Sequence, residues 1–181
     1  MILAAVDVAY SDLTAHAACI LFDAWDARWP YDAYSRWTPL PYPYVSGRFS
    51  DRELPAIKNV LGLLPAMPEI ILIDGYVWLD DAWTPGLGGN LFFMLEKRCA
   101  VIGVAKSRYR GGTHAVPVLR GKSRRPLFIT AAGMKPNDAA GHVARMHGES
   151  RIPTLLQVAD SHARSGIEVF PRDATPTLPA C

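Results

Sequence analysis

The sequence predicts an α/β protein in which a central mixed sheet, part antiparallel meander and part parallel strands, is flanked by helices. Three short apolar stretches support this prediction: residues 2–9, 70–73 and 99–105. Apart from Asp7 they are apolar, and they are rich in β-branched residues, a pattern typical of strands buried on both faces of a mostly parallel sheet. A second observation, short turns between the earliest strands, predicts the antiparallel part.

The first part of the chain is expected to form the meander. After the strand at residues 2–9, further strands are expected at 16–25 and 28–37, because short turns separate stretches of β-prone and aromatic residues. Pro30 lies near the start of the third strand, where its missing hydrogen-bond donor matters least. Residues 39–47 then read as a loop that is stiffened by prolines and carries exposed tyrosines.

The first helix is expected to open at residues 50–53 and to carry its apolar face over residues 54–64. Ser50 is a good N-cap, and Glu53 stands three residues later, so the two residues complete a capping box. Glu53 therefore has two interpretations, as a cap of its own helix or as a charged group of a functional site. Pro65 and Pro68 end this helix before the next strand.

The remainder of the chain continues the alternation of helices and strands. The glycine-rich stretch 83–90 is expected to be a loop. No repeat or linker divides the chain, so one domain is expected over residues 1–170, followed by a flexible tail at 171–181. The later elements are expected to be a helix at 91–97, strands at 115–119 and 126–130, a turn at 131–133, a helix at 137–147 capped by Asn137, and a helix at 153–164.

The positive charge of the chain is unevenly distributed. The 181 residues are half hydrophobic and carry a net charge of only +2. Between Lys97 and Arg125, however, there are nine Lys or Arg residues and no Asp or Glu (97, 98, 106, 108, 110, 120, 122, 124, 125). This basic band suits a phosphate-bearing partner such as nucleic acid. Composition alone fits a solvated loop region equally well.

Cysteine usage and hydropathy bear on the cellular compartment. Cys19, Cys99 and Cys181 have no metal-ligand spacing, which indicates a reducing compartment. No apolar stretch reaches the length that is needed to span a membrane. We therefore expect a cytoplasmic protein without membrane association. The sequence does not decide the oligomeric state, and a monomer is the working expectation.

Charged residues stand within or just after the predicted strands. Asp7 interrupts the first apolar strand, Asp74 ends the second, and Lys106 follows the third. Ligands of open α/β sheets collect beyond the carboxyl ends of strands. An unpaired carboxylate is expensive to bury, so two of them on neighbouring strands suggest a shared cation, although a single Asp-Gly pair is more often only a turn.

Three carboxylates, Asp7, Asp74 and Glu53, would together suit Mg²⁺, which prefers oxygen ligands. Their mutual repulsion would raise the pKa of at least one of them. Mg²⁺ orients water and neutralises phosphate charge, and a lysine such as Lys106 binds phosphate, so the set predicts phosphodiester hydrolysis. The histidines have no zinc-site spacing, and the chain has no nucleophile elbow for a Ser-His-Asp triad.

A series of motifs covers nearly all of residues 2–164. In order, the motifs are Val-Asp-Val-Ala-Tyr at 6–10, Pro-Tyr-Val-Ser-Gly at 43–47, Arg-Glu-Leu-Pro at 52–55, Ile-Asp-Gly at 73–75, Val-Ile-Gly-Val-Ala-Lys-Ser at 101–107, and a weaker set from Arg125-Pro through Arg151-Ile-Pro to Val158-Ala-Asp160. In combination they resemble the endonuclease V family, which consists of ribonuclease H-like nucleases that act at deaminated purines.

The resemblance implies a ribonuclease H-like fold and an Mg²⁺-dependent endonuclease, with Mn²⁺ as a substitute. The implied substrate is a phosphodiester bond near inosine or deoxyinosine in DNA or RNA, in nucleic-acid repair or processing. Carried over by position, the catalytic residues would be Asp7, Glu53, Asp74 and Lys106. The metal would be held by the three carboxylates of that set, with Asp160 beside them.

The resemblance also implies four substrate-binding residues. Tyr44 would be the wedge that enters the nucleic acid at the lesion, which agrees with an aromatic residue on a proline-stiffened loop. Gly47 and Gly75 would lie against the flipped base, where a missing side chain gives room. Ser107, directly after the active-site lysine, completes the set.

The chain departs from the family pattern in the loops rather than at the carboxylates. Ser46 stands where the family usually has proline, and Met134 stands where it usually has histidine. Asn90 lies where the family usually has a histidine-bearing motif. These changes affect lesion specificity before they affect metal binding. They leave open an alternative, a catalytically weak module of the same fold that binds nucleic acid.

Overall fold

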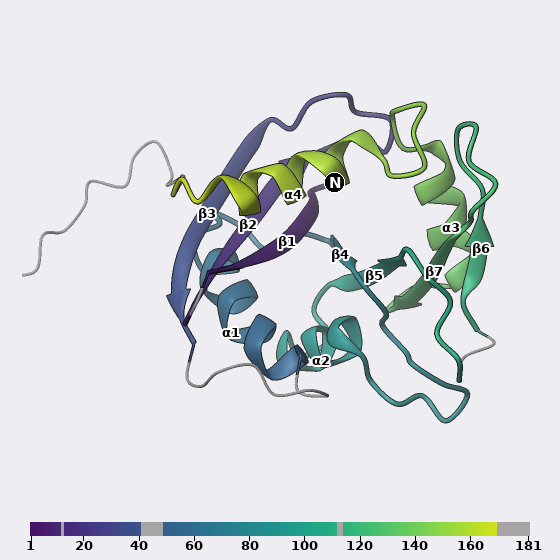
Figure 1. Cartoon of the computed structure of the whole chain (residues 1–181), viewed down its shortest axis with the longest axis horizontal. Helices are drawn as coiled ribbons and strands as arrows, with labels where there is room; N and C mark the ends of the chain where they lie inside the picture. The colour runs from purple at the N-terminus through teal and green to yellow at the C-terminus, as the bar shows by residue number, and fades with distance from the viewer. Residues whose placement is uncertain (12, 41–48, 112–113, 170–181) are drawn as a thin grey trace, which may run out of the picture.

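The computed structural model describes residues 1–11, 13–40, 49–111 and 114–169, with the side chains of 49–52 excepted. The described parts of the chain form seven strands and four helices (Figure 1). Their order is β1 (Leu3–Ser11), β2 (Thr14–Phe22), β3 (Asp32–Pro39), α1 (Phe49–Leu61), β4 (Ile70–Asp74), α2 (Leu87–Met94), β5 (Ala100–Ala105), β6 (Val116–Val118), β7 (Leu127–Ala132), α3 (Pro136–Arg145) and α4 (Thr154–Ser165).

The strands form one mixed sheet with the order β3-β2-β1-β4-β5-β7-β6. Strands β1, β2 and β3 pair as an antiparallel meander, and β4 and β5 run parallel to β1. Strand β7 returns antiparallel to β5, and β6 pairs antiparallel to β7 at the edge. The predicted α/β class, the meander and the parallel strands that end at Asp74 and before Lys106 are therefore confirmed.

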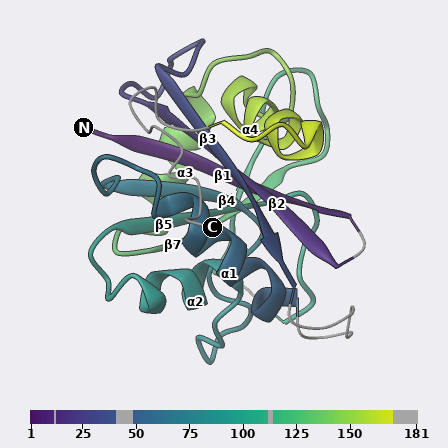
Figure 2. The ribbon, with the colours of Figure 1, turned by 90° about the vertical axis from the view of Figure 1, so that its left-hand side faces the viewer.

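Helices cover both faces of the sheet, with α1 and α2 on one side and α3 and α4 on the other (Figure 2). Each face has its own hydrophobic core. Within β4, Ile71 and Ile73 belong to the core under α1 and α2, whereas Leu72 belongs to the core under α3 and α4. This alternation is the period of two expected of a strand. When the same alternation is extended to the strand ends, it tells on which face of the sheet each charged side chain lies.

Several predicted boundaries are wrong, each for a local reason. Helix α2 begins at Leu87 instead of Leu91, because Gly88 and Gly89 are helical and lie against the connection that precedes them. A Cβ at Gly88 would come within 2.8 Å of the Val77 side chain, and one at Gly89 within 2.6 Å of the Val77 carbonyl oxygen. These glycines serve close packing rather than a loop.

Other corrections concern caps and strand ends. Helix α1 begins at Phe49, so Ser50 lies inside the helix rather than at its N-cap. Helix α3 begins at Pro136 with Lys135 as its N-cap, and Asn137 does not cap it. The third strand starts at Asp32, and β7 continues to Ala132, through the start of the predicted turn. The tail beyond residue 169 lies outside the described residues.

No helix in the described ranges is long and apolar enough to cross a membrane.

Gly103, in the middle of β5, allows the β4–α2 connection to pass directly over the sheet. The Val77 amide donates a hydrogen bond of 2.8 Å to the Thr130 hydroxyl across this point. A Cβ at Gly103 would meet the Gly75 carbonyl oxygen at 2.5 Å and the Thr130 Oγ1 atom at 2.8 Å. The position of the chain just after Asp74 therefore depends on the absence of a side chain at Gly103.

We predict that Gly103→Ala destabilises the protein by about 1–3 kcal/mol, since the added methyl group forces backbone atoms apart. Gly141→Ala is the matched control, because a Cβ at Gly141 in α3 meets nothing within 4 Å. Alanine there should instead stabilise the helix by about 0.5–1 kcal/mol. Thermal unfolding of both variants checks the contrast, and equal melting temperatures for the two would contradict the close approach at Gly103.

Candidate active site

Three charged residues lie side by side because their strands are neighbours in the parallel part of the sheet. Val6 pairs with Ile73, and Ile73 pairs with Gly103, so the carboxyl ends of β1, β4 and β5 are aligned. Asp7 and Asp74 each follow one of these paired residues. Alternation along the strands directs Asp7, Asp74 and Lys106 to the face that α4 covers.

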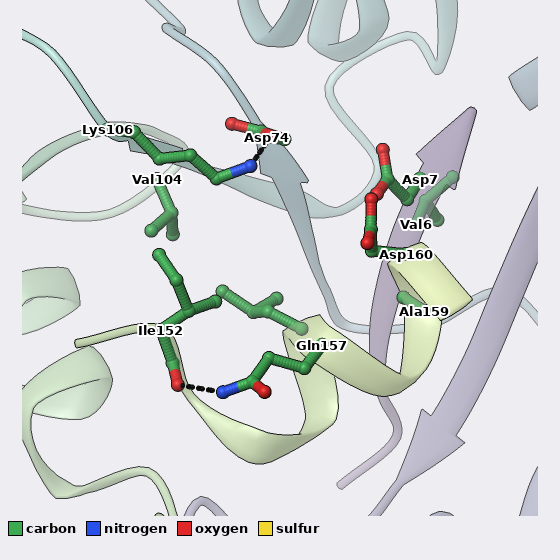
Figure 3. A pocket seen from close by; sticks show the side chains of 10 residues that line it. Val6, Asp7, Asp74, Val104, Lys106, Ile152, Gln157, Ala159 and Asp160 are labelled. Atoms are coloured by element: carbon green, nitrogen blue, oxygen red, sulfur yellow. Dashed lines mark hydrogen bonds and ion pairs between the residues drawn. The ribbon is translucent and has the colours of Figure 1, made fainter. Parts of the chain in front are cut away.

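Helix α4 closes a pocket over these strand ends and supplies a further carboxylate, Asp160. The helix packs across β1 and β2, with Leu155 and Ala159 buried in the core. Figure 3 shows that the Asp160 carboxyl group faces that of Asp7, while the Lys106 side chain extends toward Asp74. The pocket has a volume of about 110 Å³ and is lined by Val6, Asp7, Asp74, Val104, Lys106, Ile152, Leu156, Gln157, Ala159 and Asp160.

Lys106 and Asp74 form an ion pair in this pocket. The Lys106 Nζ atom donates a hydrogen bond of 2.5 Å to the Asp74 Oδ2 atom. Burial of Lys106 would lower its pKa, but the Asp74 carboxylate and the nearby Asp7 and Asp160 carboxylates outweigh this effect and raise the pKa. The lysine is therefore positively charged at neutral pH and, being about half exposed, accessible from solvent.

Asp7 and Asp160 share a hydrogen bond between their carboxyl groups. Burial, then this hydrogen bond and the Asp74 and Asp160 charges, raise the pKa of Asp7 to about 7, although the Val8 amide donates to its carboxylate. Burial would also raise the pKa of Asp160, but Arg164 and Asp7 donate to it and lower the pKa. The Arg164 Nε atom lies 2.8 Å from the Asp160 Oδ1 atom. Within this pair, Asp7 therefore binds a proton more tightly than Asp160 does.

Glu53 approaches the same end of the sheet from the opposite layer. It lies on α1, is only 6% exposed, and accepts a hydrogen bond from the Tyr10 hydroxyl group. Burial, opposed by this bond and supported by the charges of Asp7 and Asp74, raises its pKa to about 8. Its side chain is packed inward, so the alternative in which Glu53 only caps its own helix does not describe the structure.

The carboxylates converge on one end of the sheet, but they are not arranged as a complete metal-binding site. Within the described ranges, no group of three His, Cys, Asp or Glu side chains is spaced to hold a metal ion. Asp7, Asp74 and Asp160 line the pocket, and Glu53 is not among its lining residues. The raised pKa values of Asp7 and Glu53 were expected from repulsion alone, but burial is the larger cause.

The donor set fits a hard divalent cation in its chemistry. Asp7, Glu53, Asp74 and Asp160 offer carboxylate oxygens, the ligands that Mg²⁺ and Mn²⁺ prefer. Two of these groups, Asp7 and Glu53, are buried at a cost that a bound cation would remove. In the structure, the Lys106 ammonium group and the proton shared by Asp7 and Asp160 offset part of the carboxylate charge.

The expected substrate-binding residues are only partly within the described chain. Gly75 has a φ of +130°, which side chains rarely adopt, and a Cβ there would meet nothing within 4 Å. Open space therefore lies beside Gly75, next to Asp74. The Ser107 carbonyl oxygen accepts a hydrogen bond of 2.9 Å from the Tyr76 hydroxyl. Tyr44, Gly47 and the departure at Ser46 lie outside the described residues.

Sequence reasoning did not identify several residues that hold the site in place. Arg151 donates hydrogen bonds to the carbonyl oxygens of Lys106 and Pro126, the second at 2.7 Å, and so fixes the backbone that carries the lysine. Its place in the Arg-Ile-Pro motif was the only signal for this role. Tyr10 holds Glu53, and Arg164 holds Asp160 at i,i+4 spacing, which the helix pattern could have revealed.

The basic band is only partly a surface. Arg120 is 5% exposed, and its guanidinium donates to carbonyl oxygens of the α3–α4 connection, including Ser150 at 3.0 Å and Gly148 at 3.2 Å. It clamps the chain that leads into α4 and takes no part in an outer charge patch. Lys106 is engaged in the pocket. The other exposed members of the band are Lys97, Arg98, Arg108, Arg110, Lys122, Arg124 and Arg125.

Comparison with known proteins is consistent across sequence and structure. The endonuclease V family model matches residues 1–151, a range that ends before α4. Endonuclease V from Xanthomonas oryzae pv. oryzae is 35% identical over 88% of this chain and 75% of that protein. Endonuclease V from Xanthomonas axonopodis pv. citri is 34% identical over 68% of this chain. The chain spans about half of that relative, 54% of its length.

Solved structures show the same fold. Endonuclease V from Streptomyces avermitilis superposes with a TM-score of 0.74 at 24% identity, covering 91% of this chain and 80% of that one. Endonuclease V from Ciona intestinalis, solved with a 24mer DNA containing an inosine followed by a ribo-adenosine, gives a TM-score of 0.73 at 20% identity, covering 91% and 84%. The expected ribonuclease H-like fold is therefore confirmed.

We predict that Glu53 makes the metal-free protein less stable as the pH rises. Its pKa is raised from 4.5 to about 8 in the folded state. The folded protein thus binds this proton more tightly, and the stabilisation is complete below pH 4.5 and is lost as the pH rises through about 8. With divalent cations chelated, Glu53→Gln should exceed the parent in stability at pH 8 by on the order of a few kcal/mol.

Chemical denaturation of parent and variant from pH 4 to pH 9 measures this difference. Glu149→Gln is the control, since Glu149 is exposed and lies outside the pocket lining. A Glu53→Gln variant that is less stable than the parent at pH 8 would show that the ionised carboxylate is favoured in the fold.

Proposed function

The chain belongs to the endonuclease V family, and we propose that it is an Mg²⁺-dependent endonuclease that hydrolyses phosphodiester bonds near deaminated bases. The proposed substrates are DNA or RNA strands that contain inosine or deoxyinosine, in nucleic-acid repair or processing. The observation that carries the proposal is the pocket in which Asp7, Asp74, Asp160 and Lys106 meet at the carboxyl ends of parallel strands.

The pocket supplies the groups that phosphodiester hydrolysis requires. Asp7, Asp74 and Asp160, with Glu53 from the other layer, would hold Mg²⁺ or Mn²⁺. Such a cation, when bound, supplies a polarised water and positive charge against the phosphate oxygens. Part of the pocket lining, including Ile152 and Leu156, is apolar.

Lys106 is proposed to bind the scissile phosphate. Its ammonium group is charged, half exposed and fixed at the backbone by Arg151. An ammonium group has three hydrogen-bond donors, so Lys106 can retain Asp74 while it donates to a phosphate oxygen. Charge of this kind, held in position before the reaction, stabilises the negative charge that develops on the phosphate.

Asp7 and Asp160 are proposed to control a proton at the same site. The pKa of Asp7 is raised, so Asp7 binds the proton of the shared hydrogen bond, whereas Arg164 and Asp7 lower the pKa of Asp160. Carboxylates must be deprotonated to bind a metal, so cation binding displaces this proton. The site therefore becomes ready for catalysis as the pH rises above the range in which Asp7 is protonated.

The substrate class rests on family membership and on the space at Gly75. The endonuclease V of Ciona intestinalis was solved with inosine-containing DNA. In this chain, the open space beside Gly75 adjoins Asp74 and would admit a base that has left the stack. Tyr44 as the wedge, Gly47 as a base-contact residue and Ser107 as a substrate-binding residue remain predictions.

A cleavage assay separates this proposal from the alternative, a weakly catalytic module that binds nucleic acid. End-labelled strands with one inosine, in DNA and RNA forms, are incubated with Mg²⁺, with Mn²⁺ and with chelator. Metal-dependent cleavage near the inosine supports the nuclease. Binding without cleavage under either metal would favour the weakly catalytic module. The ion pair of Lys106 with Asp74 would then be a structural contact.

We predict that Asp74→Asn lowers cleavage by orders of magnitude while the fold is retained. The change removes an anionic ligand and the partner of Lys106. Both side chains are about half exposed, so the lost ion pair costs at most about 1 kcal/mol. Binding to nucleic acid should persist and remain salt-dependent. Single-turnover cleavage, filter binding and thermal unfolding together test this pattern.

The control for this variant is Asp26→Asn, an exposed aspartate on the β2–β3 connection, which should leave all three measurements unchanged. If Asp74→Asn melts the protein while Mg²⁺ leaves the melting temperature of the parent unaffected, Asp74 is a structural residue and the nuclease proposal fails.

We further predict that Mg²⁺ and Mn²⁺ bind more tightly at pH 8 than at pH 6. At pH 6 the cation competes with the proton on Asp7, whose pKa is about 7. Thermal shift titrations at the two pH values measure this directly, with a larger rise in melting temperature at pH 8. An equal rise at both values would place the cation away from Asp7.

A further inference from the structure

An exposed aromatic surface lies outside the pocket, on the β4–α2 connection and the segments beside it. It consists of Trp78, Trp83, Phe93, Tyr109 and His114, which we call the aromatic surface. Trp83 is 53% exposed, Phe93 48% and Tyr109 46%. The β4–α2 connection loops out from the body of the molecule (Figure 1). Large aromatic side chains that are exposed together mark a contact surface more often than scattered ones do.

Trp83 is held in a conformation that bulky residues rarely adopt. Its φ is +63°, in the left-handed region. The Asp80 side chain accepts hydrogen bonds from the Ala82 and Thr84 amides, both at 3.0 Å, and the Trp83 amide donates to the Asp80 carbonyl at 3.1 Å. Such strain persists only where surrounding structure imposes it, and it clusters at functional positions. Burial does not explain it here, since Trp83 is half exposed.

The ring of Trp83 is already oriented by its neighbours. It stacks on His114 with centroids 4.5 Å apart and planes 14° apart, and it meets the edge of Trp78 at 5.7 Å. The His114 Nε2 atom lies 3.1 Å from the Asp81 Oδ1 atom. Trp78 is in turn anchored by a 2.9 Å hydrogen bond from its Nε1 atom to the Ala131 carbonyl. A ring held this way can accept a further planar group at little entropic cost.

The aromatic surface is connected to the pocket through two tyrosines. The Tyr76 hydroxyl donates to the Ser107 carbonyl and accepts from the Tyr109 amide at 3.0 Å, and the two tyrosine rings are 5.9 Å apart. Ser107 directly follows Lys106. At Gly111, a Cβ would lie 3.6 Å from both the Tyr109 ring and the Asp80 side chain, so the two segments adjoin.

The charge around this surface favours an anionic partner. Arg108 and Arg110 flank Tyr109 and are exposed, and the Lys97 ammonium lies 5.6 Å from the centre of the Phe93 ring. Two carboxylates are also nearby, but Asp80 is engaged in its turn and Asp81 faces His114. Alternating basic and aromatic side chains are typical of surfaces that bind single-stranded nucleic acid.

We propose that the aromatic surface binds an unpaired segment of the nucleic-acid strand beside the cleavage pocket, with a base stacked on Trp83 and phosphates near Arg108 and Arg110. This inference rests on the proposed function. Base stacking tolerates any sequence because every base has a π-face. The surface therefore adds affinity for the strand that flanks the lesion without adding a preference for its sequence.

Binding of a fluorescein-labelled single strand with one inosine, measured in chelator so that nothing is cleaved, tests the proposal. Trp83→Ala should weaken binding roughly 5- to 100-fold, and Trp83→Tyr should retain most of the affinity of the parent. The control is Trp29→Ala, a tryptophan that is 67% exposed on the β2–β3 connection and packs with Arg28. It should bind like the parent.

Salt dependence separates stacking from charge. Trp83→Ala should leave the slope of log affinity against log salt unchanged, because no phosphate contact is lost. Arg108→Ala and Arg110→Ala should each reduce the slope by about one. Trp83→Gly serves as a second variant, since glycine adopts a positive φ without strain and so preserves the turn.

Three outcomes would overturn the inference. Equal affinity of Trp83→Ala and Trp29→Ala would assign the surface to another partner, such as a protein. Normal binding by Trp83→Gly, with a loss in Trp83→Ala that follows its melting temperature, would assign Trp83 to the fold. If the parent and the Trp29→Ala control bind no strand at all, the proposed function itself fails and the inference fails with it. This result is distinct from a loss confined to Trp83.

Discussion

The parallel pairing of β1 with β4 and of β4 with β5 is the constraint on which the site depends. Because these strands are buried on both faces, their apolar residues fix the register, and the register fixes where each strand ends. A slip of one residue would turn Asp7 or Asp74 into the other layer. The hydrophobic packing that stabilises the fold therefore also sets the positions of Asp7 and Asp74 along their strands.

Bringing carboxylates together and burying them is unfavourable in free energy, and each carboxylate has a separate partner that offsets part of this cost. Asp74 is paired with Lys106, Asp7 shares a proton with Asp160, and Glu53 is held by Tyr10 in the opposite layer. All of these contacts are made by side chains, whereas the strands pair through their backbones, so a change of partner would leave the strand pairing in place. The site thus combines a rigid frame with charges whose partners can be exchanged, which suits a group that must bind and release ionic ligands.

The sequence alone was sufficient for the elements whose signal is local. Continuous apolar runs predicted the parallel strands, and the polar residue at the end of each run predicted the edge of the sheet at which they meet. It was insufficient where the outcome depends on tertiary contacts. The stretch containing Gly88 and Gly89 looks like a loop, yet it is helical because the glycines allow close packing against Val77.

Charge was equally ambiguous at the level of sequence. Arg120 lies in the same basic stretch of the sequence as several exposed arginines. Only the fold reveals that its guanidinium group is buried against carbonyl oxygens. Likewise, the motif that contains Glu53 does not tell which layer the side chain enters. Burial and facing direction are properties of the assembled layers, so no local pattern determines them.

The position of α4 at the end of the described chain has a consequence for the order of assembly during synthesis. All seven strands emerge from the ribosome before the helix that covers β1 and β2 and supplies Asp160. Until that helix docks, the apolar face around Leu3, Ala5 and Ile20 is uncovered and Asp7 lacks its partner. A nascent chain that still lacks α4 would therefore carry an exposed sheet face and a pocket without the Asp160 carboxylate.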